Sequence, residues 1–267
     1  MLAQQQIDEE VRRLDQAETT RKQTEPSTIR FPEMEIKDAY AIQKAWMQLK
    51  QNKGRKVIGH KIGLTSKVMQ VAMGINEPDS GVLLDDMIFE NNSNIQAANF
   101  LDPKIEVELA FVLKKRLFGE NLTIEEVLDA TDYVIPALEL IAARTYRKNS
   151  KTGYVRTVRD TISDNAANAG IITGGEKVTP KSVDLRWVSA LLYKNGTIEE
   201  SGVAAAVLDH PVKGVIWLAK KYAQHNEALE AGQIILSGSF TRPIDVVVGD
   251  EIIADYGPLG KISVNFT

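Results

Sequence analysis

The decapeptide KIEVELAFVL, residues 104–113, is the feature that most constrains this chain. Its side chains alternate with a period of two, which predicts a β-strand because successive strand residues point to opposite faces. Glu106 and Glu108 share one face. The other face is entirely apolar and consists of Ile105, Val107, Leu109, Phe111 and Leu113. Any fold of this chain therefore has to accommodate two neighbouring carboxylates on one face of a strand.

Two interpretations of Glu106 and Glu108 are open. Alternating strands often present their polar face to solvent. Alternatively, two carboxylates whose Cα atoms lie about 6.5–7 Å apart converge on one cation. Hard divalent cations such as Mg²⁺ and Ca²⁺ prefer such oxygen ligands. The rest of the chain decides between these interpretations.

The overall composition excludes several classes of function. Net charge is −4, which implies no general attraction to nucleic acid or to anionic membranes. The 267 residues contain no cysteine, so a metal site has to use oxygen or imidazole ligands. The N-terminal segment is charged without an apolar core, and no run is long enough to span a bilayer. We expect a cytoplasmic protein without nucleic-acid or membrane partners.

The order of predicted elements indicates an α+β fold, since helices come first and strands dominate afterwards. Residues 1–75 are interpreted as an N-terminal helical and mixed domain, and residues 76–267 as a catalytic β domain. A narrow apolar stripe on the first helix suggests packing on another body, such as a second subunit. Helices are predicted over residues 3–23, 37–52, 124–130 and 211–224, with a helical turn at 66–72. Strands are predicted over 57–64, 82–84, 87–89, 104–113, 132–141, 185–193, 197–203, 234–237, 245–248, 251–255 and 261–265.

Glu139 is a third carboxylate of interest, because it stands in the otherwise apolar stretch 132–141. It either faces outward from its strand or is buried, in which case it needs a partner. Together with Glu106 and Glu108 it would form a three-carboxylate site that leaves positions for water and substrate. Pro136 in the same stretch predicts an edge strand or a bulge.

Lys61 lies in a short apolar strand between Gly59 and Gly63. Glycines inside a strand suggest that another backbone or a ligand approaches closely. Burial would lower the pKa of Lys61 and make it a usable acid or base, although a lysine that snorkels to solvent is the commoner case. His60 would point the other way and be structural. Asp79 reads as a residue of the turn 77–81.

Three loop segments complete the candidate site. Basic residues gather in residues 144–159, and small polar residues fill Asp160–Gly170. The turn Ser237–Pro243 is rich in Gly, Ser and Thr, and its backbone N–H groups are suited to hold a carboxylate.

These segments occur in one order along the chain: GHKIGLTS at 59–66, EPDSG at 77–81, IEVELAF at 105–111, PALE at 136–139 and the stretch 160–170. The set resembles the hydratase/decarboxylase branch of the fumarylacetoacetate hydrolase superfamily, from about Asp15 to the end. The resemblance implies a mixed β-roll with a smaller helical N-terminal domain. It also implies one Mg²⁺, with Mn²⁺ possible, on Glu106, Glu108 and Glu139, and it implies acid/base roles for Lys61 and Asp79.

The resemblance further implies a lyase and a homo-oligomer, either a dimer or a larger ring. The expected reaction of aromatic catabolism adds water to a 2-oxo-heptenedioate and gives 4-hydroxy-2-oxo-heptanedioate. Decarboxylation of a related 2-oxo diacid, or hydration of 2-hydroxypentadienoate, is the alternative. One basic group between Arg144 and Arg159, or Arg242, would bind the distal carboxylate of the small-molecule diacid. A non-catalytic scaffold and a C–C bond hydrolase are disfavoured, because the acid/base and metal set is intact and no His–Glu pair stands out.

Overall fold

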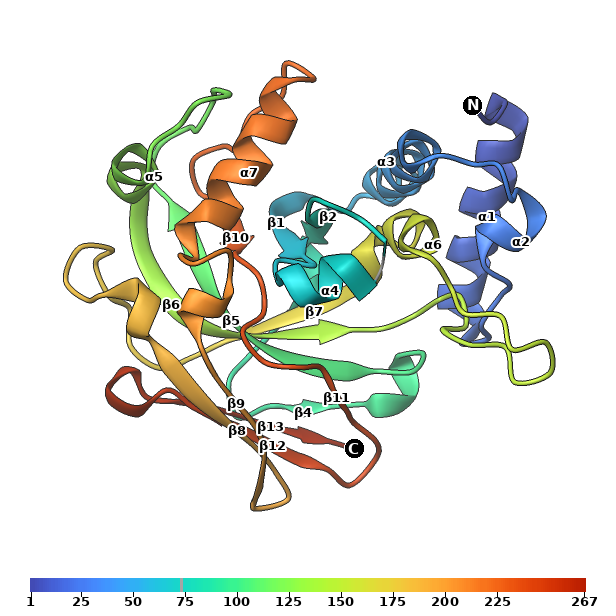
Figure 1. Ribbon diagram of the computed structural model, residues 1–267. Helices are drawn as coiled ribbons and strands as arrows, with labels where there is room; N and C mark the ends of the chain where they lie inside the picture. Colours follow the sequence, from blue (N-terminus) through green and yellow to red (C-terminus); the bar gives the residue numbers. More distant parts are fainter. Residues whose placement is uncertain (73) are drawn as a thin grey trace.

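The computed structural model describes residues 1–72 and 74–267 and consists of two sheets with helices at their margins (Figure 1). The helices are α1 (Gln4–Thr20), α2 (Ser27–Arg30), α3 (Ile36–Asn52), α4 (Lys67–Ala72), α5 (Ile124–Ala130), α6 (Val158–Ser163) and α7 (Val212–Ala223). The strands of the larger sheet are β1 (Val57–Gly63), β2 (Asp79–Leu84), β3 (Ile88–Phe89), β5 (Lys104–Leu113), β6 (Thr131–Ile141), β7 (Asn168–Thr173), β10 (Ile234–Leu236) and β11 (Ile244–Asp245). The strands of the smaller sheet are β4 (Asn94–Ile95), β8 (Ser189–Lys194), β9 (Thr197–Val203), β12 (Glu251–Asp255) and β13 (Lys261–Phe266).

Strand β5 occupies the middle of the larger sheet, whose order is β2-β1-β10-β5-β6-β7-β3. One edge of β5 pairs antiparallel with β6 along its whole length, and the other edge pairs with β10 and β11. The sheet is mixed, because β1 runs parallel to β10 and β3 runs parallel to β7. The curled, mixed sheets confirm the predicted α+β fold and β-roll (Figure 1). The bounds predicted for residues 104–113 and 124–130 are also correct.

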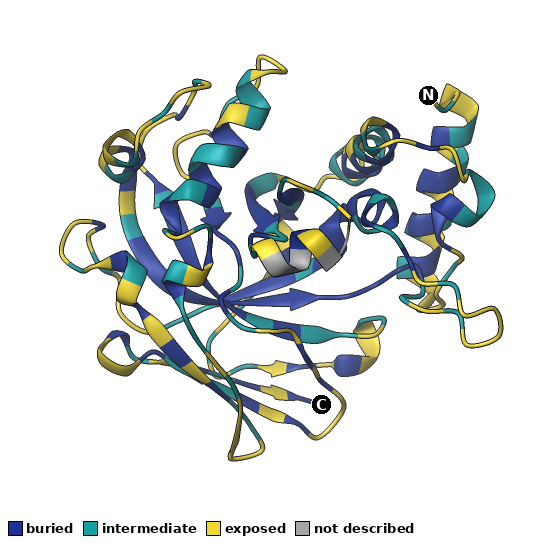
Figure 2. Ribbon diagram, in the orientation of Figure 1, coloured by how far each residue is buried: buried dark blue, intermediate teal, exposed yellow. Residues whose placement is uncertain are grey.

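The main core lies between the apolar face of β5 and the inner face of the smaller sheet. Val107 and Leu109 are completely buried there with Ile252 and Val264. Buried residues alternate with more exposed ones along β12 and β13 and the first part of β8 in the smaller sheet, whereas β5, β6 and β7 are buried along most of their length (Figure 2). Burial on both faces explains why the Glu face of β5 is not the solvated face that one interpretation expected.

Helices α1 and α3 form a second, smaller core with α6. Leu14 and Trp46 are almost fully buried in it. The apolar stripe of the first helix therefore packs on another element, as predicted, and that element is α3 of the same chain. Strand β1 belongs to the larger sheet although it precedes residue 75. The division of the chain between residues 75 and 76 stays a prediction.

Pro136 lies within the sheet, so the prediction of an edge strand was wrong. Strand β6 pairs with β5 on one side and with β7 on the other. The pairing with β7 starts at Ala137, and the carbonyl of Pro136 accepts only a long hydrogen bond from Gly174 N, 3.3 Å away. Proline has no backbone N–H to donate. It is tolerated at position 136 because β7 ends at Thr173, so the ladder between β6 and β7 loses no hydrogen bond there.

Strand β2 begins at Asp79, so the turn predicted for residues 77–81 extends too far. Asp79 and Ser80 pair with Gly63 and Ile62 of β1. In the described residues no helix has the length and apolar character that crossing a membrane requires.

Gly59 shows why glycine is needed inside β1. A Cβ atom at this position would lie 1.9 Å from the carbonyl oxygen of Ile234 on β10. Gly59→Ala is therefore expected to push β1 away from β10 and to lower the free energy of unfolding by about 3 kcal/mol. Urea unfolding measures this change. Ser201→Ala, on the exposed strand β9, is the matched control, and an unchanged stability of Gly59→Ala would contradict the close approach.

Candidate active site

The three predicted glutamates converge on one point of the larger sheet. Glu106 on β5 pairs directly with Glu139 on β6, and Glu108 follows two residues along β5. Each contributes a carboxylate oxygen to a group whose members all lie within 4.8 Å of one another. Glu108 and Glu139 are completely buried, and Glu106 is partly buried. The antiparallel register thus gathers three carboxylates where the spacing within β5 alone provides two.

Glu108 is held by the turn that follows β10. The backbone N–H of Gly238 donates to Glu108 Oε2 at 2.8 Å. Gly238 has a φ of +118°, and a Cβ atom here would lie 2.5 Å from Thr65 Cγ2. The turn at 237–243, predicted to hold a carboxylate, thus holds one from the chain itself.

Tyr256 supports the same site, although the sequence analysis missed it. Its hydroxyl lies 2.9 Å from the carbonyl oxygen of Glu108 and 2.6 Å from that of Ala137. The hydroxyl thereby ties together β5 and β6 directly beneath the glutamates. The only sequence signal was a tyrosine before a Gly-Pro turn, which does not predict such a contact.

The chemistry of the carboxylates suits a divalent cation. Glu108 Oε1 and Glu139 Oε2 are buried and accept no hydrogen bond from the described residues. Burial and the mutual proximity of the glutamates raise the pKa of Glu106 and of Glu108. Buried carboxylates with free oxygens are costly unless a positive charge compensates them. The residues present therefore fit a hard cation of the Mg²⁺ type.

Lys61 on β1 points to the same glutamates. Its Nζ lies 3.2 Å from Glu139 Oε1, and its side chain is only 4% exposed. Burial is the largest influence on its pKa and lowers it, but Glu139, Asp79 and the other two glutamates together outweigh this and raise the pKa above the ordinary value. The expectation of a lowered pKa was therefore wrong for the chain alone, because it considered burial without the neighbouring negative charges.

The side chains of Asp79 and Lys61 both occupy the space that the missing side chain of Gly63 leaves free. Asp79 pairs with Gly63 across β2 and β1. A Cβ atom on Gly63 would lie 2.3 Å from Asp79 Oδ1 and 3.0 Å from Lys61 Nζ. Asp79 is buried, and burial raises its pKa although Lys61 and Arg156 oppose the shift. Both glycines of β1 thus serve a close approach, as predicted: Gly59 for a backbone, Gly63 for two side chains.

His60 lies on the opposite side of β1, as its position next to Lys61 predicts. Its Nδ1 is 2.8 Å from the hydroxyl of Tyr222 on α7. Burial lowers the pKa of His60 to about 4, so the ring is neutral near pH 7. It borders a pocket of about 560 Å³ that residues of α3 and α7 line. His60 is therefore separate from the carboxylate cluster.

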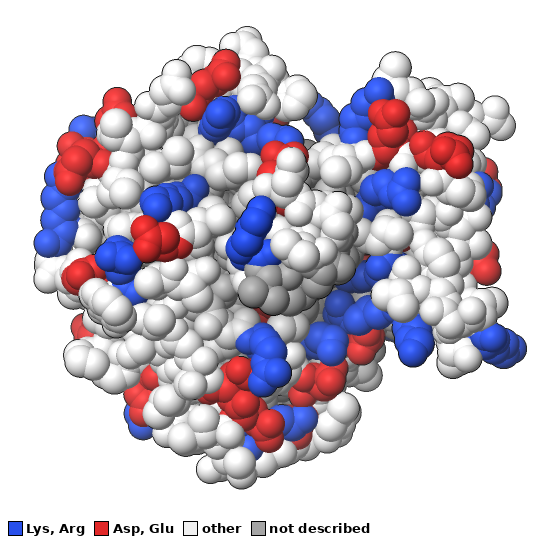
Figure 3. All heavy atoms as spheres, viewed as in Figure 1, with Lys and Arg blue, Asp and Glu red and all other residues white. Residues whose placement is uncertain are grey.

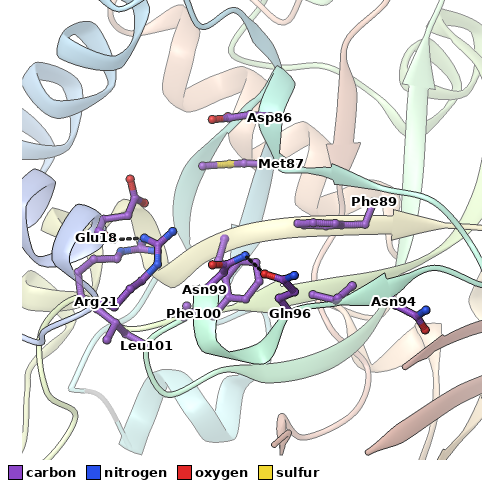
Figure 4. A pocket seen from close by; sticks show the side chains of 14 residues that line it. Glu18, Arg21, Asp86, Met87, Phe89, Asn94, Gln96, Asn99, Phe100 and Leu101 are labelled. Carbon is purple, nitrogen blue, oxygen red and sulfur yellow. Dashed lines mark hydrogen bonds between the residues drawn. The ribbon is translucent and has the colours of Figure 1, made fainter. Parts of the chain in front are cut away.

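A different pocket, of about 520 Å³, lies where the end of α1 approaches the segment after β2 (Figure 4). Glu18, Arg21, Asp86 and Phe100 are among its lining residues, and Lys61, Asp79 and the three glutamates are not.

On the face shown in Figure 3, basic and acidic side chains are interspersed. Neither feature adds to the chemistry of the carboxylate cluster.

The pKa of Glu106, raised to about 7 by burial and by Glu139, predicts a pH-dependent metal affinity. A cation binds the deprotonated carboxylate, so a proton on Glu106 competes with it at low pH. We expect the affinity for Mg²⁺ to rise at least about tenfold from about pH 6 to about pH 8, because burial and Glu139 also raise the pKa of Glu108. Titration calorimetry at each pH measures it, and a constant affinity over this range would contradict the shifted pKa.

Comparison with known proteins places these residues in a family. Residues 46–266 match the family model described as fumarylacetoacetate (FAA) hydrolase C-terminal. The chain therefore belongs to the fumarylacetoacetate hydrolase family. It is 57% identical over 254 residues to 2-oxo-hept-4-ene-1,7-dioate hydratase of Escherichia coli, which covers 95% of each chain. It is 38% identical over 262 residues to 2-keto-4-pentenoate hydratase of Paraburkholderia xenovorans, covering 98% of this chain and 95% of the relative.

A solved structure agrees with this placement. The chain superposes on 4-oxalocrotonate decarboxylase from Pseudomonas putida G7, complexed with magnesium and adipate, with a TM-score of 0.94. The two are 33% identical, and the match covers 100% of this chain and 99% of the other. Hydratases and decarboxylases of this kind are lyases, so the relatives share a reaction class while they differ in the group that is added or lost.

Proposed function

We propose that this protein is a Mg²⁺-dependent hydratase that converts 2-oxo-hept-4-ene-1,7-dioate, or its 2-hydroxy-dienedioate tautomer, to 4-hydroxy-2-oxo-heptanedioate. The observation that carries the proposal is a buried Lys61 Nζ 3.2 Å from Glu139, in a cluster of three carboxylates. This arrangement pairs a proton carrier with a cation site. The 57% identity to the Escherichia coli hydratase supports the choice of substrate.

Glu106, Glu108 and Glu139 would hold the metal ion. When bound, Mg²⁺ compensates the carboxylate charges and supplies Lewis-acid polarisation of the 2-oxo group of the substrate. Mn²⁺ is proposed as a substitute, since it accepts the same oxygen ligands. The magnesium in the related decarboxylase supports the choice of cation.

Lys61 and Asp79 would move the protons. Lys61 carries a proton on Nζ, because its pKa is raised. Asp79 Oδ1 is buried and accepts no hydrogen bond from the described residues, so it is free to exchange a proton. In the proposed reaction, the 2-hydroxyl group of the dienol gives up its proton while a proton is added to C5, which leaves a C3–C4 double bond conjugated with the C2 carbonyl. The oxygen of a water molecule then bonds to C4, and a proton of that water ends on C3.

Decarboxylation is the second candidate, because the related decarboxylase has the same fold with a TM-score of 0.94. The purified protein with Mg²⁺ is given 2-hydroxy-hepta-2,4-dienedioate and, separately, 4-oxalocrotonate. A hydratase yields a product 18 mass units heavier from the first substrate and no CO₂. Release of CO₂ without any hydrated product would overturn the assignment.

A homo-oligomer, either a dimer or a larger ring, and a cytoplasmic location also remain proposals. They rest on the resemblance to the family. Light scattering coupled to gel filtration tests the oligomer directly, and a mass of 29.6 kDa in solution would contradict it.

A further inference from the structure

We propose that Arg156 binds the distal carboxylate of the substrate and thereby selects a diacid over a monoacid. This inference rests on the proposed function. It selects one residue from the basic candidates that the sequence left open, which are those between Arg144 and Arg159 and Arg242. Three observations carry it: the position of Arg156 near the part of β2 that pairs with Lys61, the hydrogen-bond donors of its side chain that no described residue accepts from, and its long contact with a carboxylate that Arg144 already holds.

Arg156 reaches the site through the segment that packs on β2. Asn165 Oδ1 accepts a hydrogen bond from Val82 N at 2.8 Å, and a Cβ atom on Gly81 would lie 2.5 Å from Asn165 O. The residue before Asn165 is Asp164, and its Oδ2 lies 3.4 Å from Arg156 Nη1. Arg156 therefore lies near Gly81 of β2, the residue that pairs with Lys61 of β1. The influence of Arg156 on the pKa of Asp79 agrees with this placement.

Part of the guanidinium of Arg156 donates no hydrogen bond to the described residues. The residue is only 8% exposed, and the one hydrogen bond that its side chain makes to the described residues is the long contact of Nη1 with Asp164. In the part of the chain that the structure describes, Nε and Nη2 donate to no acceptor. A guanidinium with two such donors suits a carboxylate, which it can bind in a bidentate manner.

Asp164, the carboxylate that Arg156 contacts, is shared with a second arginine. Arg144 Nε lies 2.5 Å from Asp164 Oδ1, whereas Arg156 Nη1 lies 3.4 Å from Asp164 Oδ2. Arg147, which is near Arg156 in the chain, is paired with Asp102 at 2.6 Å. Arg156 is therefore the more weakly held partner of Asp164, and a substrate carboxylate would bind its guanidinium at a shorter distance.

The other candidate arginines are already committed or lie away from the cluster. Arg144 donates to Asp164 and to Asn168 O through all three of its nitrogens. Arg159 donates to two backbone carbonyls near the start of α3, and the side chain of Arg242 is 82% exposed and paired with Glu200. Among these residues Arg156 is the one that is both buried and underused.

The test compares a diacid with a monoacid. Arg156→Met is assayed with 2-hydroxy-hepta-2,4-dienedioate and with 2-hydroxypenta-2,4-dienoate, in the presence of Mg²⁺. We expect kcat/KM for the diacid to fall at least about 30-fold, mainly through KM, and the monoacid to change less than about threefold. Arg242→Met is the matched control and should leave both unchanged. Equal losses on the two substrates, or no loss on the diacid, would overturn the proposal.

A binding measurement separates this proposal from the proposed function. Calorimetry with Mg²⁺ and adipate, against pentanoate as the monoacid, needs no turnover. If the wild-type protein hydrates neither substrate, the hydratase assignment fails, yet weaker adipate binding in Arg156→Met still supports the role of Arg156. If Arg156→Met does not fold, Arg156→Lys decides. It keeps the charge and loses the bidentate fork, so it should bind adipate about tenfold more weakly, and wild-type affinity would overturn the proposal.

Discussion

Glu108→Gln is expected to lower Mg²⁺ affinity and Mg²⁺-dependent turnover by more than about 100-fold while the fold is retained. The amide keeps the shape of the side chain and keeps an oxygen for the N–H of Gly238, which donates at 2.8 Å. It removes a completely buried carboxyl group whose charged form burial and Glu139 disfavour. The metal-free variant should therefore melt at a higher temperature than the metal-free wild type.

Two measurements check this result together. Calorimetry gives the Mg²⁺ affinity, and thermal unfolding with and without Mg²⁺ gives the stability that the metal contributes. Glu125→Gln, at an exposed position of α5, is the control and should behave as wild type. Retained affinity in Glu108→Gln would remove Glu108 from the ligand set.

Lys61→Met is expected to reduce kcat by about 100- to 10,000-fold, the range that general acid–base catalysis contributes. Methionine fills the same buried space without a proton to give. Mg²⁺ binding should be preserved or tightened, because the ammonium group 3.2 Å from Glu139 no longer competes with the cation. The metal-free variant should be less stable, since Glu139 loses its positive partner in the interior.

The contrast between turnover and metal binding makes this variant informative. Steady-state kinetics measure kcat, and calorimetry measures the Mg²⁺ affinity of the same preparation. Lys56→Met, at an exposed position just before β1, controls for the loss of a lysine. A kcat near that of wild type would show that Lys61 is not the proton carrier.

Local patterns predicted much of the fold correctly. The alternation of residues 104–113 predicted β5 with its bounds, and the Asn-Gly turn predicted the hairpin of β8 and β9. These features depend on near neighbours in the chain, so the sequence contains them. Pro136 was placed wrongly because its environment depends on where β7 ends, and β7 lies more than thirty residues further on.

Three facts about the site were determined by the sequence alone. Thiolate ligands were excluded because cysteine is absent, three glutamates stood in predicted strands, and Lys61 lay between two glycines. Only the tertiary structure decided that Glu106 pairs with Glu139, that Lys61 is raised and not lowered in pKa, and that Arg156 has free donors. Strand register, burial and charge balance arise between segments far apart in the chain. The sequence determines the chemical type of each side chain. Its neighbours are determined only by the fold, and they decide its charge state and which of its hydrogen-bond donors are unused.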